Sequence, residues 1–441
     1  MAEIETFRDP ALSLWQSALH AVIARRQPDQ AAALSSSHPL MQQANAVAKA
    51  LDRTRPDALA ALGAAILDPV ASLATRLALA LFARDQQLVA EFTDRFQFGT
   101  HDPLWAEALI EYGKILAERK AIPYRTYQTL GDFVLPMPAK DPLVIGVIAD
   151  WGTGTDEAKQ LLADIAARRP DLLIHLGDIY YSGTMLETQQ NFYALVRGQF
   201  PDIPIFTLSG NHEMYSGGAG YYALLDQLGQ PASFFCLRNA DWQLLAMDTG
   251  RHDSDVFTVN ANLTYLEPAE AAWHQDKLAN AGGRKTIALS HHQLFTAFAD
   301  GVGRDAAGRA LAVNPNLLAT FADPAKGMSL DKIALWLWGH EHNLVIFAPY
   351  LGLARGRCIG AGAVPVEVAS RPYAVNPALA PPPGHDDLPT PIPAAQLASA
   401  GGFYDHCYAT ITLSGAAARV DYYQTPLDGG ASTLTYSETI A

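Results

Sequence analysis

The sequence lacks the features that mark a disulfide-stabilised or membrane-spanning protein. It has three cysteines, Cys236, Cys358 and Cys407, and none are closely spaced, so neither a disulfide framework nor a structural zinc site is expected. The N-terminus has no basic start followed by an apolar run, and no secretory signal is predicted. The most apolar stretch, 62–83, is interrupted by Asp68, Pro69 and Arg76 and predicts a buried helix. We therefore expect a cytoplasmic protein without a membrane partner.

Positive charge is also scarce. The 441 residues include 31 Lys and Arg against 45 Asp and Glu, a net charge of −14. This balance argues against nucleic acid as the main partner, because phosphate backbones are bound by basic surfaces. A small phosphorylated substrate remains compatible, since bound metal ions can supply positive charge locally. The glycine-rich stretch 216–220 lacks the Lys-Ser/Thr ending of a nucleotide P-loop, and no serine nucleophile elbow occurs.

Residues 1–126 read as a helical domain of unknown role. Apolar residues recur at helical spacing near the start, at Leu12, Trp15, Leu19, Val22 and Ile23. Asp-Pro pairs at 68–69 and 102–103 predict two further helix starts. This part contains no metal-ligand spacing, so we expect it to pack on the catalytic part or to bind a protein partner.

Residues 127–441 read as a second domain of α/β class. Apolar runs predict strands at 133–135, 143–149, 172–176, 203–208, 234–237, 244–247, 286–289 and 333–338, with helices near 156–169, 186–197, 219–228 and 268–280. Further strands are predicted at 344–347, 408–413 and 418–423, and the proline-rich stretch 376–400 predicts a long irregular excursion. Strands joined first by helices and then by turns suggest a mixed two-sheet sandwich flanked by helices.

Five polar motifs each follow one of these strands. They are Asp150-Trp-Gly152, Gly177-Asp178-Ile-Tyr-Tyr181, Gly210-Asn211-His212-Glu213, His291-His292 and Gly339-His340-Glu-His342. Ligands gather outside the carboxyl ends of strands in α/β sheets, so the five motifs are expected to converge. Ordinary turns would supply Asp, Asn and Gly, but not histidine at three of five positions. Oxygen ligands combined with imidazoles suit iron, manganese and zinc, and such a set predicts metal-assisted hydrolysis.

The motifs resemble those of calcineurin-like metallophosphoesterases, and within them the purple acid phosphatase branch. That branch has Asp-x-Gly, Gly-Asp-x-x-Tyr, Gly-Asn-His-(Asp or Glu), Val-x-x-His and Gly-His-x-His. The resemblance covers 127–441 and implies a mixed two-sheet αββα sandwich. Gly152 stands where many relatives have histidine, which favours this branch over cyclic-nucleotide phosphodiesterases. The Val-x-x-His motif of that branch corresponds to Ala288-Leu-Ser-His291 in this chain, with Ala288 in place of Val.

The resemblance implies a role for each residue. Asp150, Asp178, Tyr181 and His342 would hold a first metal ion, and Asp178, Asn211, His291 and His340 a second, with Asp178 bridging. Fe(III) is expected in the first site, and Fe(II), Mn or Zn in the second. The predicted catalytic residues are His212, as phosphate hydrogen-bond donor or general acid, Glu213, which would orient it, and His292. The implied activity is hydrolysis of phosphate monoesters by metal-bound hydroxide.

Several alternatives stay open from the sequence. His292 could replace His291 as the ligand, and Tyr181 could be a core residue, since Tyr180 adjoins it. Residues 251–253 either touch the substrate or form a solvated turn. The enzyme could instead be a phosphodiesterase or nucleotide hydrolase, and a scaffold protein with a vestigial metal site is a further reading.

Overall fold

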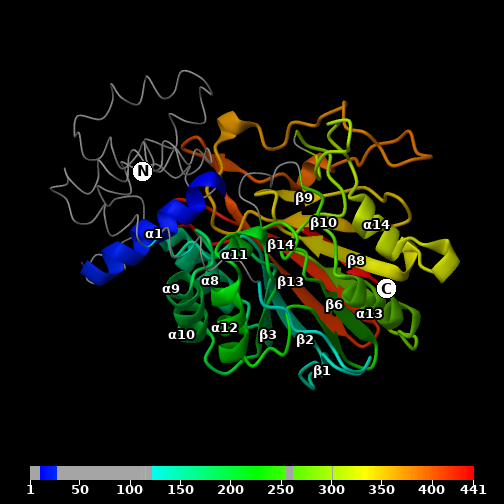
Figure 1. The fold of residues 1–441 in the computed structure, drawn as a ribbon, viewed down its shortest axis with the longest axis horizontal. Helices are drawn as coiled ribbons and strands as arrows, with labels where there is room; N and C mark the ends of the chain where they lie inside the picture. The colour runs from blue at the N-terminus through cyan, green and yellow to red at the C-terminus, as the bar shows by residue number, and fades with distance from the viewer. Residues whose placement is uncertain (1–9, 27–110, 112–114, 116–121, 255–261, 300) are drawn as a thin grey trace, which may run out of the picture.

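The computed structural model describes residues 10–26, 111, 115, 122–254, 262–299 and 301–441 (Figure 1). Within these ranges the chain forms two large mixed sheets. The larger has the strand order β1-β5-β6-β7-β8-β10-β9. Its strands are β1 (Val134–Pro136), β5 (Phe235–Arg238), β6 (Trp242–Ala246), β7 (Lys285–Leu289), β8 (Ile333–Trp338), β10 (Gly356–Ile359) and β9 (Leu344–Ile346).

The second sheet has the order β15-β14-β13-β2-β3-β4. Its strands are β15 (Thr433–Ile440), β14 (Ala417–Thr425), β13 (His406–Ser414), β2 (Leu143–Ile148), β3 (Leu172–His175) and β4 (Ile205–Thr207). Strands β2, β3 and β4 run parallel, as do β6, β7 and β8 in the larger sheet. A short pair, β11 (Ser399–Ala400) and β12 (Phe403–Tyr404), stands apart.

The two sheets face each other across one apolar core, because alternate residues along a strand point to opposite faces. In β2, Ile145 and Val147 enter the core shared by both sheets, while Ile148 packs on the outer side. In β8, Leu337 enters the same core and Trp338 packs outward. Burial on both faces explains why these strands are continuous apolar runs instead of alternating ones.

Helices cover both outer faces of the sandwich (Figure 1). The second sheet is covered by α8 (Asp156–Ala167), α9 (Met185–Glu187), η2 (Thr188–Tyr193), α10 (Ala194–Gln199) and α12 (Ala219–Leu228), and the larger sheet by α13 (Pro268–Ala279) and α14 (Pro315–Phe321). Apolar side chains at helical spacing, such as Leu161 and Ile165 of α8, make these contacts. The predicted two-sheet sandwich flanked by helices is confirmed.

The structure refines several predicted elements. The helix expected at 186–197 is divided into α9, η2 and α10. Strands β10 and β15 were not foreseen, and both lie beside partners that only the tertiary fold supplies. The excursion 376–400 contains only the short helix Pro393–Ala395 and strand β11.

Helix α1 (Pro10–Arg26) lies where the first apolar pattern predicted a helix. The helix starts predicted at 68–69 and 102–103 lie outside the described residues, so the domain boundary near 126 stays a prediction. Helix α1 contacts α11 (Asn211–Tyr215), which carries part of the third motif. No described helix is both long and apolar enough to span a bilayer.

Candidate metal centre

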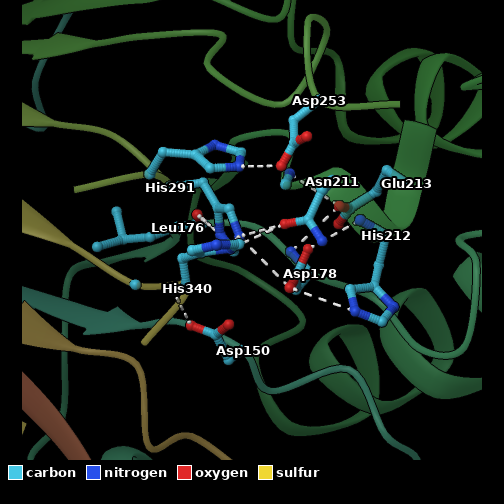
Figure 2. A network of polar contacts seen from close by, with 12 residues as sticks. Asp150, Leu176, Asp178, Asn211, His212, Glu213, Asp253, His291 and His340 are labelled. Carbon is cyan, nitrogen blue, oxygen red and sulfur yellow. Dashed lines mark hydrogen bonds and ion pairs between the residues drawn. The ribbon is translucent and has the colours of Figure 1, made fainter. Parts of the chain in front are cut away.

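The five motifs meet at one edge of the sandwich, each at the carboxyl end of its strand (Figure 2). The second sheet supplies the oxygen donors, with Asp150 after β2, Asp178 after β3 and Asn211 after β4. The larger sheet supplies the imidazoles, with His291 after β7 and then His340 and His342 after β8. The site therefore exists only where the ends of both sheets come together.

Sharp backbone turns aim the ligands across this edge. Asp150, Asp178 and His340 have φ angles of +52°, +74° and +67°, in the left-handed region that costs non-glycine residues about 1–2 kcal/mol each. Such strain concentrates at functional sites, where the surrounding structure holds it in place. Glycine at 210 and 339 is required by close approach, because a Cβ there would press on the carboxylates of Asp178 and Asp150 respectively.

One cluster contains all four ligands predicted for the second metal. The Asn211 Oδ1 atom lies 3.1 Å from His291 Nε2 and 3.0 Å from His340 Nδ1. The His291 Nε2 atom also lies 3.3 Å from Asp178 Oδ2. Since His291 donates its Nδ1–H to the carbonyl of Leu176 at 3.0 Å, its Nε2 is the nitrogen left to bind a cation.

A second cluster contains three of the ligands predicted for the first metal. His342 Nε2 lies 3.3 Å from Asp150 Oδ1. The hydroxyl of Tyr180 lies 3.1 Å from His342 Nε2, 3.3 Å from Asp178 Oδ2 and 3.4 Å from Asp150 Oδ1. Asp178 Oδ2 thus faces both clusters, which is the position of a bridging carboxylate.

The phenol placed among these carboxylates belongs to Tyr180, whereas the prediction named Tyr181. Tyr181 is buried, and its backbone carbonyl lies beside the imidazole of His212. The sequence signal was the adjacent tyrosine pair, which left the choice to the path of the chain after Asp178. Tyr180 is therefore a candidate ligand that motif spacing missed, and the Tyr181 assignment stays a prediction.

The electrostatics of the cluster suit bound cations. Burial raises the pKa of Asp150 to about 8. Burial acts in the same direction on Asp178, but His291 and His212 outweigh it and hold the pKa of Asp178 well below its usual range. The pKa of His291 is raised to about 9, because Asp178 and Asp150 outweigh its burial. Metal ions that bind here would displace protons from these groups.

The spacing of the donor atoms also fits two metal ions. Donor atoms of Asp150, Asp178 and His291 lie within 4.8 Å of one another, and so do those of His291, His292 and His340. Burial and the neighbouring imidazoles of His292 and His291 lower the pKa of His340 well below its usual range, so it is a neutral donor. Carboxylate, amide and imidazole donors in two overlapping groups are the ligands preferred by iron, manganese and zinc.

His212 lies beside the bridging carboxylate with one nitrogen free to face the cavity. Its Nδ1 lies 2.5 Å from the carbonyl oxygen of Tyr181, and its Nε2 lies 3.9 Å from Asp178 Oδ2. Glu213 was predicted to orient this imidazole, but the structure gives that contact to Tyr181. The Glu213 carboxylate instead accepts the backbone N–H groups of Asp178 and Gly210, at 3.1 and 2.8 Å, because it caps the first turn of α11. Glu213 thus positions the backbone of two motifs.

Both ring nitrogens of His292 contact partners outside the cluster that His291 enters, although a donor atom of His292 lies within 4.8 Å of those of His291 and His340. Its Nε2 lies 3.0 Å from Asp253 Oδ2 and its Nδ1 lies 3.1 Å from the hydroxyl of Thr249. With both ring nitrogens engaged, His292 serves to hold Asp253 and its own backbone in place. Asp253 is buried and lines the same cavity, so of the uncertain stretch 251–253 it is the residue that reaches the site.

A buried hydrogen-bond cluster supports the site from behind. Glu187 of α9 accepts hydrogen bonds from the backbone of Ser182 and Thr184, at 3.1 and 3.0 Å, and from the hydroxyl of Ser17 in α1 at 2.8 Å. Although burial opposes it, the contact with His20 of α1 lowers the pKa of Glu187 to about 2. Helix α1 thereby braces the loop that follows Asp178 and Tyr180, a role with no motif in the sequence.

A cavity of about 230 Å³ opens directly on the candidate ligands. Its lining includes the ligand candidates Asp178, Asn211, His340 and His342 together with His212, and it extends to a wall of small and apolar residues at Phe298, Ala299, Gly301, Val302, Gly303 and Pro372. The volume is sufficient for a small ligand that reaches the metal cluster.

Comparison with known families agrees with this geometry. Residues 143–344 match the model of the calcineurin-like phosphoesterase family. The matched range includes all five motifs. No curated protein matches the sequence.

Solved structures resemble the fold distantly. A purple acid phosphatase from yellow lupin seeds is 14% identical with a TM-score of 0.46, and the match covers 70% of this chain and 55% of the lupin chain. The GAP50 anchor of the Plasmodium inner membrane complex is also 14% identical, with a TM-score of 0.41 over 68% of this chain and 88% of its own. Vps29 from Entamoeba histolytica is 9% identical, with a TM-score of 0.29 over 68% and 98%. Likenesses at this level carry no conclusion about activity.

Proposed function

We propose that the chain is a two-metal phosphoesterase that hydrolyses small phosphate monoesters. The observation that carries the proposal is the meeting of two donor clusters on the shared carboxylate of Asp178 at the floor of a ligand-sized cavity. Two bound cations would supply a hydroxide nucleophile near neutral pH and neutralise charge on the phosphoryl group. The match of residues 143–344 to the calcineurin-like phosphoesterase family supports the reaction class.

The residues of the chain divide the remaining work. Asp150, Tyr180, Asp178 and His342 would hold one cation, and Asp178, Asn211, His291 and His340 the other. We propose iron in the first site, since a phenolate is a hard donor that favours Fe(III), and Fe(II), Mn or Zn in the second. His212 faces the cavity through Nε2, and its Nδ1–H donates to the carbonyl of Tyr181. In the doubly protonated imidazolium form, Nε2–H would donate a hydrogen bond to the ester oxygen as it leaves.

The test is hydrolysis of an aryl phosphate by the metal-loaded protein and by two variants. Asp178→Asn removes the charge that both clusters share, and His340→Ala removes an imidazole of the second cluster. Each variant is expected to lose at least a hundredfold in kcat while keeping the wild-type circular dichroism spectrum. A matched control is His385→Ala, because His385 is half-exposed and lies outside the cavity lining.

The outcomes separate the proposed activity from its rivals. Unchanged turnover in Asp178→Asn would refute the assignment of the site. A wild-type protein that binds no metal and hydrolyses no ester would favour a scaffold role. A preference for bis(aryl) phosphate over aryl phosphate would make the protein a phosphodiesterase.

A further inference from the structure

One basic side chain lines the cavity outside the metal centre. Arg371 is the single arginine or lysine among the described lining residues, and Asp178, Asp253 and Glu341 are the carboxylates there. Its side chain is exposed to solvent at the cavity wall. Within the described part of the chain, no hydrogen bond or ion pair engages its guanidinium, which is therefore free to bind an anion from solution.

The backbone of Arg371 is held in a conformation that arginine does not favour. Its φ and ψ angles are +53° and +49°, in the left-handed region where a turn without other constraints takes glycine or asparagine. Seven described non-glycine residues have positive φ, and three of them are the ligand candidates Asp150, Asp178 and His340. Arg371 thus shares a strained geometry with the residues of the site, as expected where a side chain must be aimed.

Hydrogen bonds fix the Arg371 turn relative to the fifth motif. The side-chain amide of Asn343 donates from Nδ2 to the carbonyl of Pro372 at 3.5 Å. The backbone N–H of Leu344 donates to the hydroxyl of Tyr373 at 3.3 Å. Both donors directly follow His342. The turn itself is closed by the N–H of Arg371, which donates to the carbonyl of Val368 at 3.1 Å. The turn that carries Arg371 is therefore tied to the residues after the candidate ligand His342, on the wall of the same cavity.

The chemistry of this wall matches a second anion. The hydrolysed phosphoryl group would lie on the metal cluster, so the part of the substrate that extends along the cavity reaches Arg371. A guanidinium binds phosphate and carboxylate through paired hydrogen bonds, which a lysine cannot reproduce. We propose that Arg371 binds a second anionic group of the substrate, so that the preferred substrates are phosphate esters carrying a further phosphate or carboxylate. This inference rests on the proposed phosphoesterase activity.

The experiment compares three substrates that share one hydrolysable phosphate. Phenyl phosphate has no second anion, 4-carboxyphenyl phosphate adds a carboxylate, and 4-phosphonophenyl phosphate adds a phosphonate, which mimics a second phosphate and is not hydrolysed. In Arg371→Ala, kcat/KM for the substrate class that Arg371 binds is expected to fall about tenfold, mainly through KM, while phenyl phosphate changes less than about twofold. For the same substrate class, kcat/KM of Arg371→Lys is expected to lie between that of the wild type and that of Arg371→Ala. The substrate that shows the loss tells carboxylate from phosphate.

A matched control is Arg304→Ala, which also removes one exposed positive charge near the cavity. Arg304 follows Gly303 in the sequence but is not part of the lining, and its guanidinium bonds to the carbonyl of Gly308. It should leave all three substrates unchanged. Equal losses in Arg371→Ala for all three substrates, or no loss for either anionic one, would overturn this inference alone. Absence of hydrolysis in the metal-loaded wild type would overturn the phosphoesterase proposal and this inference with it.

Discussion

Replacing Gly339 with alanine is a direct test of how closely the two sheets must approach at the site. Gly339 precedes His340 at the end of β8, and Asp150 ends β2 in the opposite sheet. A Cβ on residue 339 would overlap the Asp150 Oδ2 atom and come within 2.8 Å of the Cβ of Ala149. The backbone of Gly339 does not have positive φ, so alanine adds a steric effect and no backbone strain.

The structure sets the size of the effect. Relief of the overlap requires the Asp150 carboxylate to move, and Oδ2 now accepts the backbone N–H of His340 at 2.9 Å. Since the pKa of Asp150 is raised to about 8, its carboxyl is largely neutral in the metal-free protein, and this hydrogen bond contributes about 0.5–1.5 kcal/mol. Overpacking costs about 1–3 kcal/mol. We expect Gly339→Ala to lose about 2 kcal/mol of unfolding free energy. The same movement displaces the candidate ligand Asp150. If metal binding loses a similar free energy, the metal dissociation constant rises about tenfold or more.

A matched glycine-to-alanine control is expected to change the free energy of unfolding in the opposite direction. Gly198 lies in helix α10, and a Cβ there meets nothing within 4 Å. Gly198→Ala should gain about 0.5–1 kcal/mol through helix propensity, with unchanged metal binding. The assay is urea unfolding of the metal-free proteins, together with metal content after dialysis against buffered metal. If Gly339→Ala keeps two metals per chain, wild-type affinity and wild-type stability, the close approach of the sheets has been misread.

Two further predictions concern single side chains. In iron-loaded protein, Tyr180→Phe should abolish the visible absorption band of tyrosine-to-iron charge transfer, whereas Tyr181→Phe should retain it. The reason is that the Tyr180 hydroxyl lies among the carboxylates. Loss of the band in Tyr181→Phe and its retention in Tyr180→Phe would restore Tyr181 as the ligand. For Glu270, burial and then the neighbouring carboxylate of Asp248 raise the pKa well above its usual 4.5. It is therefore protonated in the fold but ionised in the unfolded chain at neutral pH, so wild-type stability is lost as pH rises above about 4.5. The free energy of unfolding of Glu270→Gln should therefore rise relative to that of the wild type by about 1.4 kcal/mol per pH unit between pH 5 and the pKa of Glu270 in the folded protein. Urea unfolding at a series of pH values measures this difference. Two parallel curves of stability against pH would contradict the prediction.

Local sequence was sufficient for most elements of the second domain. Strands β2, β3, β7 and β8 are apolar runs buried on both faces, and each was predicted within one residue at its start. Strands β10 and β15 were missed because their place depends on partners distant in sequence, such as β8 for β10 and β14 for β15. The division of the helix at 186–197 was also missed, since its residues carry no proline or glycine break before Gly198.

The site shows the same limit at the level of side chains. Five strand ends with Asp, Asn and His predicted the kinds of candidate ligand and the proposed reaction class, because residue type limits which metals a donor set prefers. Spacing could not decide which of two adjacent tyrosines reaches Asp178, since that depends on the path of the loop between β3 and α9. Nor could it show that Glu213 holds backbone N–H groups, which requires the turn of α11 to be formed.

The sequence by itself determined a set of carboxylate, amide and imidazole donors, their order along the chain and the strands that carry them. The tertiary structure decided that the oxygen donors come from one sheet and the imidazoles from the other. It also decided that helix α1 braces the loop after Asp178 through Glu187, and that Arg371 faces the same cavity. The physical reason is that strand formation follows from local apolar pattern, whereas the approach of two sheet edges follows from packing between residues far apart in sequence.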